Sequence, residues 1–204
     1  MARFAYDHEV LERFPKVVGG VIHADGVTNR PSPAELTAVF RAEQASVQER
    51  IGETPLSELP TLAAWRGVFR LFGVNPTKYR SAAEALLRRL TKQGDIPSID
   101  ALVDVANLVS IRYALPVAVF DQRDVAGGTV VRLAHGGEAW ADLGSSQTEH
   151  PDPGEVIFCD EDERVSARRW CWRQSKASAA REDTTEILVT VEGHHEAAPD
   201  DIDR

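Results

Sequence analysis

Cysteine is scarce in this chain of 204 residues, which contains only Cys159 and Cys171. Two thiols are too few for a disulfide framework. No cluster of closely spaced ligands suits a structural zinc ion. We therefore expect two reduced, buried thiols and no metal or other cofactor. A chain of this length buries on the order of 70% of its unfolded surface, so it can fold without disulfides or a bound metal ion.

Long apolar runs are also missing. A membrane-spanning helix needs about 18 or more consecutive apolar residues, and the sequence has no such stretch. The N-terminus lacks the apolar core of a secretory signal. We expect a cytoplasmic protein that does not associate with membranes.

Several motifs of common enzyme classes are absent. The sequence has no GxGxxG dinucleotide motif, no phosphate-binding Walker loop, no GxSxG nucleophile elbow and no HExxH zinc motif. Nothing in the sequence therefore points to the reactions that these motifs mark.

The charge is negative overall but unevenly distributed. A net charge of −9 argues against general affinity for nucleic acid. However, residues 66–92 carry one acid and seven bases: Arg66, Arg70, Lys78, Arg80, Arg88, Arg89 and Lys92. Residues 164–181 carry no acid and six bases: Arg164, Arg168, Arg169, Arg173, Lys176 and Arg181. The two stretches form a cationic surface for phosphates if they meet, and are otherwise ordinary solvated faces.

Helical signals dominate the first half of the chain, and strand signals dominate the second. Two capping boxes begin at Ser32 and Ser81. Apolar spacing predicts helices over residues 33–51, 62–72, 82–93 and 99–113. Valine-rich and alternating runs predict strands over residues 16–22, 117–120, 129–133, 156–159, 168–173 and 186–191. Gly127-Gly128 and Gly136-Gly137 resemble hairpin turns.

This order of elements is typical of an α+β fold, with helices packed on a mostly antiparallel, layered sheet. We expect a single domain over residues 1–192. Residues 193–204 are acidic and lack apolar periodicity, so we expect a disordered tail.

Two polar features stand out within apolar surroundings. Asn107 lies in a nearly all-apolar helix, where its amide forms either a structural hydrogen bond or a ligand contact. In a strand, Trp170, Trp172 and Gln174 share one face. They would then fill the core or form the wall of a ligand pocket.

Residues 80–191 resemble the beta-chain editing domain of phenylalanyl-tRNA synthetase. The segments that carry the resemblance are Leu86-Leu87-Arg88-Arg89-Leu90, Val103-Asp104-Val105-Ala106-Asn107-Leu108-Val109 and Leu115-Pro116-Val117-Ala118-Val119-Phe120-Asp121. Shorter matches are Arg132-Leu133-Ala134, Gly137-Glu138 and Asp183-Thr184. The resemblance implies an α+β fold that holds the 3′ end of a mischarged tRNA and hydrolyses its aminoacyl ester.

The resemblance also implies a set of site residues. Asn107 and Gln174 are the catalytic candidates. The substrate-binding candidates are Ala106, Pro116, Ala118, Glu138, Trp170, Trp172, Arg173, Ser175 and Thr184. The tRNA-binding candidates are Arg80, Arg88, Arg89, Arg169 and Lys176. No metal ligand is expected.

The sequence departs from the family at the pocket. Ala118 stands where the family has a histidine, Ala106 where it has a threonine, and Trp170-Cys171 where it has Ala-Gly. The tryptophan would narrow the cavity, so we expect an amino acid side chain smaller than tyrosine.

Three functions remain open. The first is a trans-acting aminoacyl-tRNA deacylase. The second is a non-catalytic tRNA-binding or accessory module, which the missing histidine favours. The third is a small-molecule protein that binds amino acids, which the acidic net charge favours. The oligomeric state is not indicated.

Overall fold

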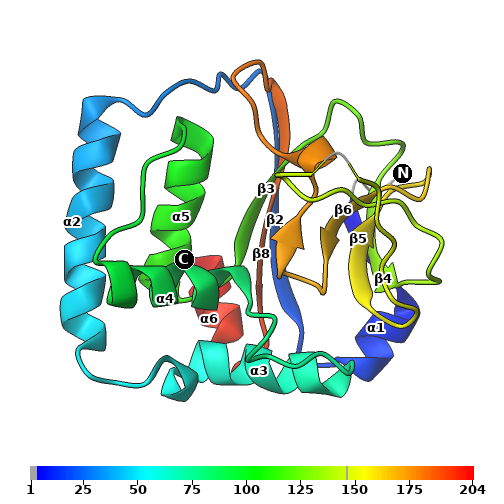
Figure 1. Ribbon diagram of the computed structural model, residues 1–204, viewed down its shortest axis with the longest axis horizontal. Helices are drawn as coiled ribbons and strands as arrows, with labels where there is room; N and C mark the ends of the chain where they lie inside the picture. The colour runs from blue at the N-terminus through cyan, green and yellow to red at the C-terminus, as the bar shows by residue number, and fades with distance from the viewer. Residues whose placement is uncertain (1–3, 146) are drawn as a thin grey trace.

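The structure of the chain is a computed structural model that describes residues 4–145 and 147–204. Its strands form two sheets, and most of its helices lie on one side of the smaller sheet (Figure 1). The architecture is α+β, as the sequence predicts. In the described part of the chain, no helix is long and apolar enough to cross a membrane.

The smaller sheet is antiparallel and has the order β2-β8-β3. Its strands are β2 (Val18–Asp25), β8 (Glu186–Gly193) and β3 (Val117–Asp121). The last strand in the sequence therefore lies at the centre, and β3 forms one edge. Across the sheet, Thr190 of β8 is paired with Ala118 of β3.

The larger sheet has the order β1-β4-β5-β6-β7. Its strands are β1 (Phe4–Tyr6), β4 (Thr129–Leu133), β5 (Val156–Cys159), β6 (Val165–Arg168) and β7 (Arg173–Gln174). The first pair, β1 with β4, is parallel, and the other pairs are antiparallel. An aromatic core that includes Trp65, Phe120, Phe158 and Trp170 links the two sheets and α3.

Six helices are present in the described residues: α1 (His8–Arg13), α2 (Ala34–Ile51), α3 (Pro60–Leu71), α4 (Ala82–Gln93), α5 (Ala101–Tyr113) and α6 (Ala198–Asp203). Two short 3-10 turns, η1 (Leu56–Glu58) and η2 (Lys176–Ser178), lie between them. In α4, the Ser81 hydroxyl accepts a hydrogen bond from the Glu84 amide, and Gly94 ends the helix with φ 89°. Figure 1 shows α2, α4 and α5 together beside the β2-β8-β3 sheet.

The other capping box does not form. Pro33 begins α2 without a side-chain cap. The Ser32 hydroxyl instead donates to Asp104 in α5, where it helps to fix the two helices relative to each other.

The expected strand over residues 168–173 is interrupted by a turn. Arg169 and Trp170 have positive φ angles of 45° and 61°, and the Trp172 amide donates to the Arg168 carbonyl. These angles are incompatible with a continuous strand. Trp170, Trp172 and Gln174 therefore do not share one strand face, and the chain forms a tight β6–β7 connection instead.

The expected hairpins at the two glycine pairs are also wrong. Gly127-Gly128 lies between β3 and β4, which belong to different sheets. Gly136, with φ 97°, lies at the start of the long connection between β4 and β5, where its amide donates to the Glu138 carboxylate.

The acidic tail is helical where we expected disorder. Helix α6 packs on β2 and β8, with Ala198 fully buried. The Ile202 side chain covers Gly20 so closely that a Cβ there would lie 2.8 Å from Ile202 Cγ2. This contact arises from tertiary packing, which the polar composition of the tail does not reveal.

The neighbouring Gly19 makes space for Tyr6, since a Cβ there would lie 2.2 Å from the Tyr6 hydroxyl oxygen. We expect Gly19→Ala to displace that hydroxyl and lower the free energy of unfolding by about 1–3 kcal/mol. Urea denaturation measures this loss. Gly67→Ala is the matched control, because a Cβ at Gly67 meets nothing within 4 Å and alanine favours a helix. Equal losses of unfolding free energy in Gly19→Ala and Gly67→Ala would contradict the close packing of Tyr6 on Gly19.

Candidate functional site

A pocket of about 560 Å³ lies along the edge strand β3. Helices α4 and α5 contribute one wall, and the turn between β6 and β7 contributes another. The lining is mostly apolar. It contains nine of the residues singled out from the sequence: Arg89, Ala106, Asn107, Pro116, Ala118, Trp170, Trp172, Arg173 and Gln174. The asparagine helix and the tryptophan segment therefore enclose one cavity, hereafter the apolar pocket.

Asn107 is half-buried on α5 and lines the apolar pocket. Its side chain makes no hydrogen bond with any residue that the structure describes. The structural bridge considered from the sequence is therefore absent, and the amide is available to a ligand.

Glu192 is a buried carboxylate at the end of β8 and also lines the pocket; it is 3% exposed. Its Oε1 accepts hydrogen bonds from the Tyr6 hydroxyl at 2.6 Å and from the Trp170 indole nitrogen at 2.9 Å. Burial raises the pKa of Glu192 to about 7, and the two hydrogen bonds oppose that rise. Glu192 was not among the predicted site residues, because the expected strand ends at Val191. The period-two alternation with Leu188 and Thr190 was the available signal.

The first strand contributes to this site. Tyr6 of β1 reaches Glu192, and burial together with that carboxylate raises the pKa of the phenol. The His194 ring packs edge-on against Trp65 and Trp170, with ring centroids 4.6 and 4.9 Å apart. Burial lowers the pKa of His194 to about 4, so the ring is neutral at pH 7.

Gln174 uses its amide nitrogen to join two parts of the fold. Nε2 donates to the Val119 carbonyl at 2.8 Å and to the Ser178 carbonyl at 2.7 Å. Both donors of the amide are thereby used, which connects β7 to β3. This geometry favours a positioning role for Gln174.

Three expected substrate-binding residues lie outside the lining of the apolar pocket. The Glu138 carboxylate holds Arg132 and the amides of His135 and Gly136. The Ser175 hydroxyl donates to the Ala141 carbonyl.

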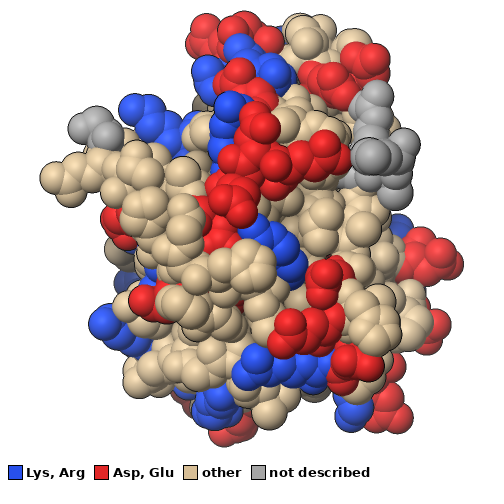
Figure 2. Space-filling model, turned by 90° about the vertical axis from the view of Figure 1, so that its right-hand side faces the viewer, with Lys and Arg blue, Asp and Glu red and all other residues tan. Residues whose placement is uncertain are grey.

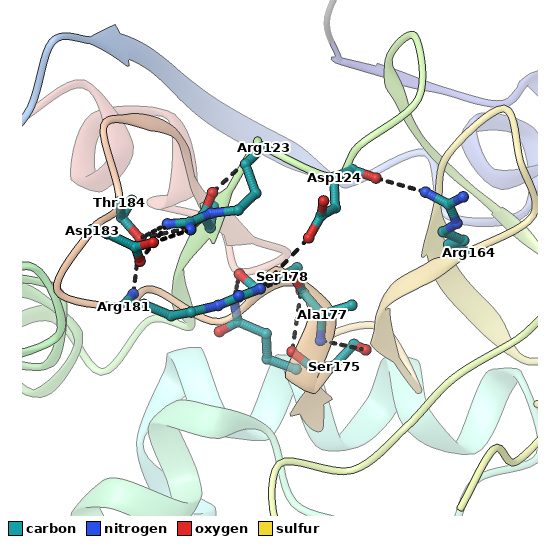
Figure 3. Close-up of polar contacts among 11 residues, drawn as sticks. Arg123, Asp124, Arg164, Ser175, Ala177, Ser178, Arg181, Asp183 and Thr184 are labelled. Atoms are coloured by element: carbon teal, nitrogen blue, oxygen red, sulfur yellow. Dashed lines mark hydrogen bonds and ion pairs between the residues drawn. The ribbon is translucent and has the colours of Figure 1, made fainter. Parts of the chain in front are cut away.

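The third residue, Thr184, donates to Asp121 and accepts from the Arg181 amide. Figure 3 shows Thr184 beside Asp183 and Arg123, within a network of loop contacts that also includes Arg181 and Asp124. These hydrogen bonds stabilise loops, so the pocket lining gives no support to the expectation of direct substrate contact for the three residues.

A second hollow of about 530 Å³ adjoins the apolar pocket. It is lined by Lys78, Arg80, Ala85, Arg88, Arg89, Lys92, Gln93, Trp172 and Arg173, and is hereafter the basic groove. Ala85, Arg89, Trp172 and Arg173 line both spaces and form the mouth between them. The first basic stretch therefore supplies five bases to the groove, whereas the second supplies Arg173, which also pairs with Asp142. Among the described residues that line the groove there is no acid.

The basic groove continues around α4. A third hollow of about 480 Å³ shares Arg80, Arg88 and Lys92 with it and adds Arg66. Glu84 holds Arg66 at 2.7 Å and Arg80 at 3.7 Å. In contrast, the face shown in Figure 2, on the side of the five-stranded sheet, has acidic and basic side chains interspersed.

Two expected tRNA-binding residues are placed elsewhere. Arg169 is 7% exposed and lies between two rings, 4.0 Å from the Tyr79 centroid and 4.6 Å from that of Trp172. It also pairs with Glu155 at 3.6 Å, so its charge is already compensated. Lys176 is exposed on η2 and does not line the groove.

The raised pKa of Glu192 leads to a prediction of how stability depends on pH. Its pKa of about 7 in the folded chain exceeds the ordinary value of 4.5, so the folded chain binds this proton more tightly. Its contribution to stability is present at low pH and is lost as the pH rises to about 7. We expect Glu192→Gln to gain about 1–3 kcal/mol of stability relative to the parent between about pH 5 and 8.

Urea denaturation across this pH range measures the difference between the two proteins. His194 titrates in both, so its contribution cancels. If the difference in free energy of unfolding between the parent and Glu192→Gln does not change with pH, the raised pKa of Glu192 is contradicted.

Comparison with known proteins places this chain in a family. Residues 64–199 match the model of the B3/4 domain. A phenylalanine–tRNA ligase beta subunit from Bradyrhizobium diazoefficiens is 36% identical over 121 residues, covering 59% of this chain and 15% of that protein. One from Mesorhizobium japonicum is 32% identical over 184 residues, covering 83% of this chain and 22% of that protein. The chain thus spans less than a quarter of the length of these relatives.

Among solved structures, an N-terminal fragment of the phenylalanyl-tRNA synthetase beta subunit from Pyrococcus horikoshii matches with a TM-score of 0.44 and 11% identity. That match covers 95% of this chain and 43% of the fragment. From the family model, the chain belongs to the B3/4 domain family.

Proposed function

We propose that the chain is a trans-acting aminoacyl-tRNA deacylase that hydrolyses mischarged tRNA in the cytoplasm. One observation carries the proposal: the apolar pocket adjoins the basic groove, and four residues line both. A charged tRNA has the matching parts, an aminoacyl group on an anionic, single-stranded 3′ end. The relatives are named as tRNA ligase subunits, and this supports the link to tRNA.

The basic groove suits the nucleotides next to the ester. Its cationic side chains can neutralise phosphates, and the Trp172 ring at the mouth offers a surface on which an unpaired base can stack. Because the chain as a whole carries a net charge of −9, attraction to RNA is confined to this surface.

Hydrolysis requires water to attack the ester carbonyl carbon. The bond from that carbon to the ribose oxygen breaks, and the ribose oxygen takes a proton from the water. Asn107 can donate its amide hydrogens to the oxyanion that develops on the carbonyl. A hydroxyl of the terminal ribose can orient the water. Gln174 holds the pocket wall in place.

Trp170 supports a limit on the size of the substrate. Its indole is fully buried, is held by Glu192, and packs edge-on against Phe14 and Trp65 with centroids 5.1 and 5.4 Å apart. These contacts hold the ring in place at the wall of the pocket. We expect the aminoacyl side chain to be smaller than tyrosine.

Asn107→Ala tests the catalytic step. Loss of one oxyanion donor should lower the single-turnover rate of deacylation by about 100-fold. The affinity for tRNA should stay unchanged, because Asn107 does not line the basic groove. Release of radiolabelled amino acid measures the rate, and filter binding measures the affinity.

Val105→Ala is the control on the same helix, since Val105 is 49% exposed and lies outside the lining. It should leave both quantities unaltered. Equal loss of rate and affinity in Asn107→Ala would argue against a catalytic role.

Arg88→Ala and Lys92→Ala test the basic groove. Neither residue forms an ion pair within the part of the chain that the structure describes, so each charge is available to a phosphate. Each variant should bind tRNA more weakly and reduce the slope of log affinity against log salt by about 1. Arg70→Ala is the control, because Arg70 is exposed on α3 outside the groove. A similar change in Arg70→Ala would indicate non-specific attraction.

A second function is favoured by the departure from the family's histidine, where this chain has Ala118. Among the described residues that line the apolar pocket there is no histidine. A non-catalytic tRNA-binding or accessory module would bind charged tRNA through the same groove and leave the ester intact. Salt-sensitive binding without release of amino acid would establish that alternative.

A further inference from the structure

The outer edge of β2 is not paired with any strand that the structure describes. β2 lies at one side of the three-stranded sheet, and its eight residues pair with β8 in an unbroken register. Apart from this ladder, the main chain of residues 18–22, 24 and 25 forms no hydrogen bond with the described residues. A strand with one neighbour presents a row of N–H and C=O groups on its free side. These donors and acceptors are available to another strand.

The other sheet edges are short or covered. On the opposite side of the same sheet, Gln174 donates to the Val119 carbonyl, and Phe120 forms a bridge with Ala179. In the larger sheet, the edge strands β1 and β7 have three and two residues. β2 is therefore the longest uncovered edge in the part of the chain that the structure describes.

β2 lacks the features by which proteins protect an exposed edge. Natural edge strands often carry a proline, a bulge or a lysine. Between Val18 and Asp25 the sequence has no proline and no basic Lys or Arg, and the register with β8 does not shift. Instead, the β-branched residues Val21 and Ile22 are 43% and 63% exposed in the middle of the strand. An edge of this kind favours the addition of another strand.

Opposite charges stand near the two ends of this edge. Lys16 lies just before the strand and Asp25 is its last residue, and both are exposed. Neither forms an ion pair within the described residues. Antiparallel pairing of two β2 strands brings the beginning of one strand beside the end of the other. Each lysine then lies beside the aspartate of the second copy, so the edge is complementary to itself.

We propose that two copies of this chain associate through an antiparallel pair of β2 strands and form one continuous six-stranded sheet. A two-fold axis perpendicular to the sheet relates the copies, so the residue at the axis lies opposite itself. With Val21 at the axis, its side chain meets its own copy, and Ile22 lies opposite Gly20 of the second copy. Lys16 then lies within one residue of the position opposite Asp25.

Gly20 gives Ile22 an apolar neighbourhood. A Cβ at Gly20 would lie 2.8 Å from Ile202 and 3.0 Å from Val191, so these two side chains fill the space above the glycine. Residues directly opposite each other in an antiparallel pair project from the same face of the sheet. Ile22 of the second copy therefore lies beside Ile202. The pairing removes this exposed isoleucine from water twice in each dimer.

The association leaves the apolar pocket open. The pocket lies along β3, which is at the opposite edge of the same sheet from β2. In the six-stranded sheet, the two β3 strands are outermost and lie about 24 Å apart across five strand spacings. The inference does not depend on the proposed function, and either can fail while the other stands.

Sedimentation velocity of the full chain over a wide range of concentration tests the association. The mass should rise to twice the 22.4 kDa of one chain. Ile22→Lys places a charge in the middle of the pair and should leave a monomer. Leu71→Lys is the matched control, because Leu71 is 62% exposed on α3, away from this edge, and this variant should remain dimeric. A monomer at every concentration, or equal weakening in the two variants, would overturn the inference.

Exchange of the two charges tests the antiparallel pairing without altering the middle of the strand. Lys16→Glu and Asp25→Lys each replace two attractive pairs in the dimer by two repulsive ones. Each should raise the dissociation constant about tenfold. The double variant has both charges reversed and should recover the parental dissociation constant. If the double variant is as weak as the single variants or weaker, the two residues do not meet and the pairing is wrong.

Hydrogen exchange locates the interface. Amides on the free side of β2 should exchange more slowly above the dissociation constant than below it, because they gain hydrogen-bond acceptors in the dimer. The amides of α2 serve as the internal control and should exchange at the same rate in both conditions. Slower exchange confined to a segment other than β2 would show that the dimer uses another surface, and it would refute the proposal.

Discussion

The hydrogen bonds of Glu192 connect the parts of the fold that form the pocket. Tyr6 comes from the five-stranded sheet, Trp170 from the turn after β6, and Glu192 itself from the centre of the smaller sheet. The Glu192 carbonyl also accepts from the Trp65 indole of α3 at 3.3 Å. Hydrogen bonds from two sheets and one helix thus meet at one residue, Glu192. The N-terminal strand completes the site, although the family match covers only residues 64–199.

Local signals predicted the helices well and the sheets poorly. The bounds of α4 follow from Ser81 and Gly94, which act within their own turns. The division of the strands into two sheets depends on contacts between distant segments, such as β1 with β4. The turn at Arg169 and Trp170 has positive φ without a glycine, so composition gave no sign of it. Likewise, α6 packs on β2 through the contact of Ile202 with Gly20, which are separated by almost the whole length of the chain.

The candidate site was predictable where residue type and periodicity agree. Asn107 in an apolar helix and the tryptophan segment do line one cavity, and the first basic stretch lines the groove beside it together with Arg173 of the second. The predicted residues that lie outside the pocket and groove share a feature: each has protein partners that the sequence does not reveal. Arg169 is neutralised by Glu155, and Thr184 is held by Asp121. Conversely, Glu192 was missed because its burial is set by strands far away in the sequence.

The environment of Glu192 is hard to explain by folding alone. The Tyr6 hydroxyl and the Trp170 indole both donate to Oε1. The folded chain therefore supplies hydrogen bonds to only one of the two carboxylate oxygens. A glutamine or an aliphatic residue at this position would avoid the cost of burying a charge. The remaining oxygen faces a pocket whose other walls are mostly apolar, and a ligand can satisfy it there. A polar group that weakens the fold but completes a binding site is typical of functional positions, where stability and function conflict. Among the described residues, Glu192 Oε2 has no hydrogen-bond donor, which supports the proposal that the pocket binds a ligand.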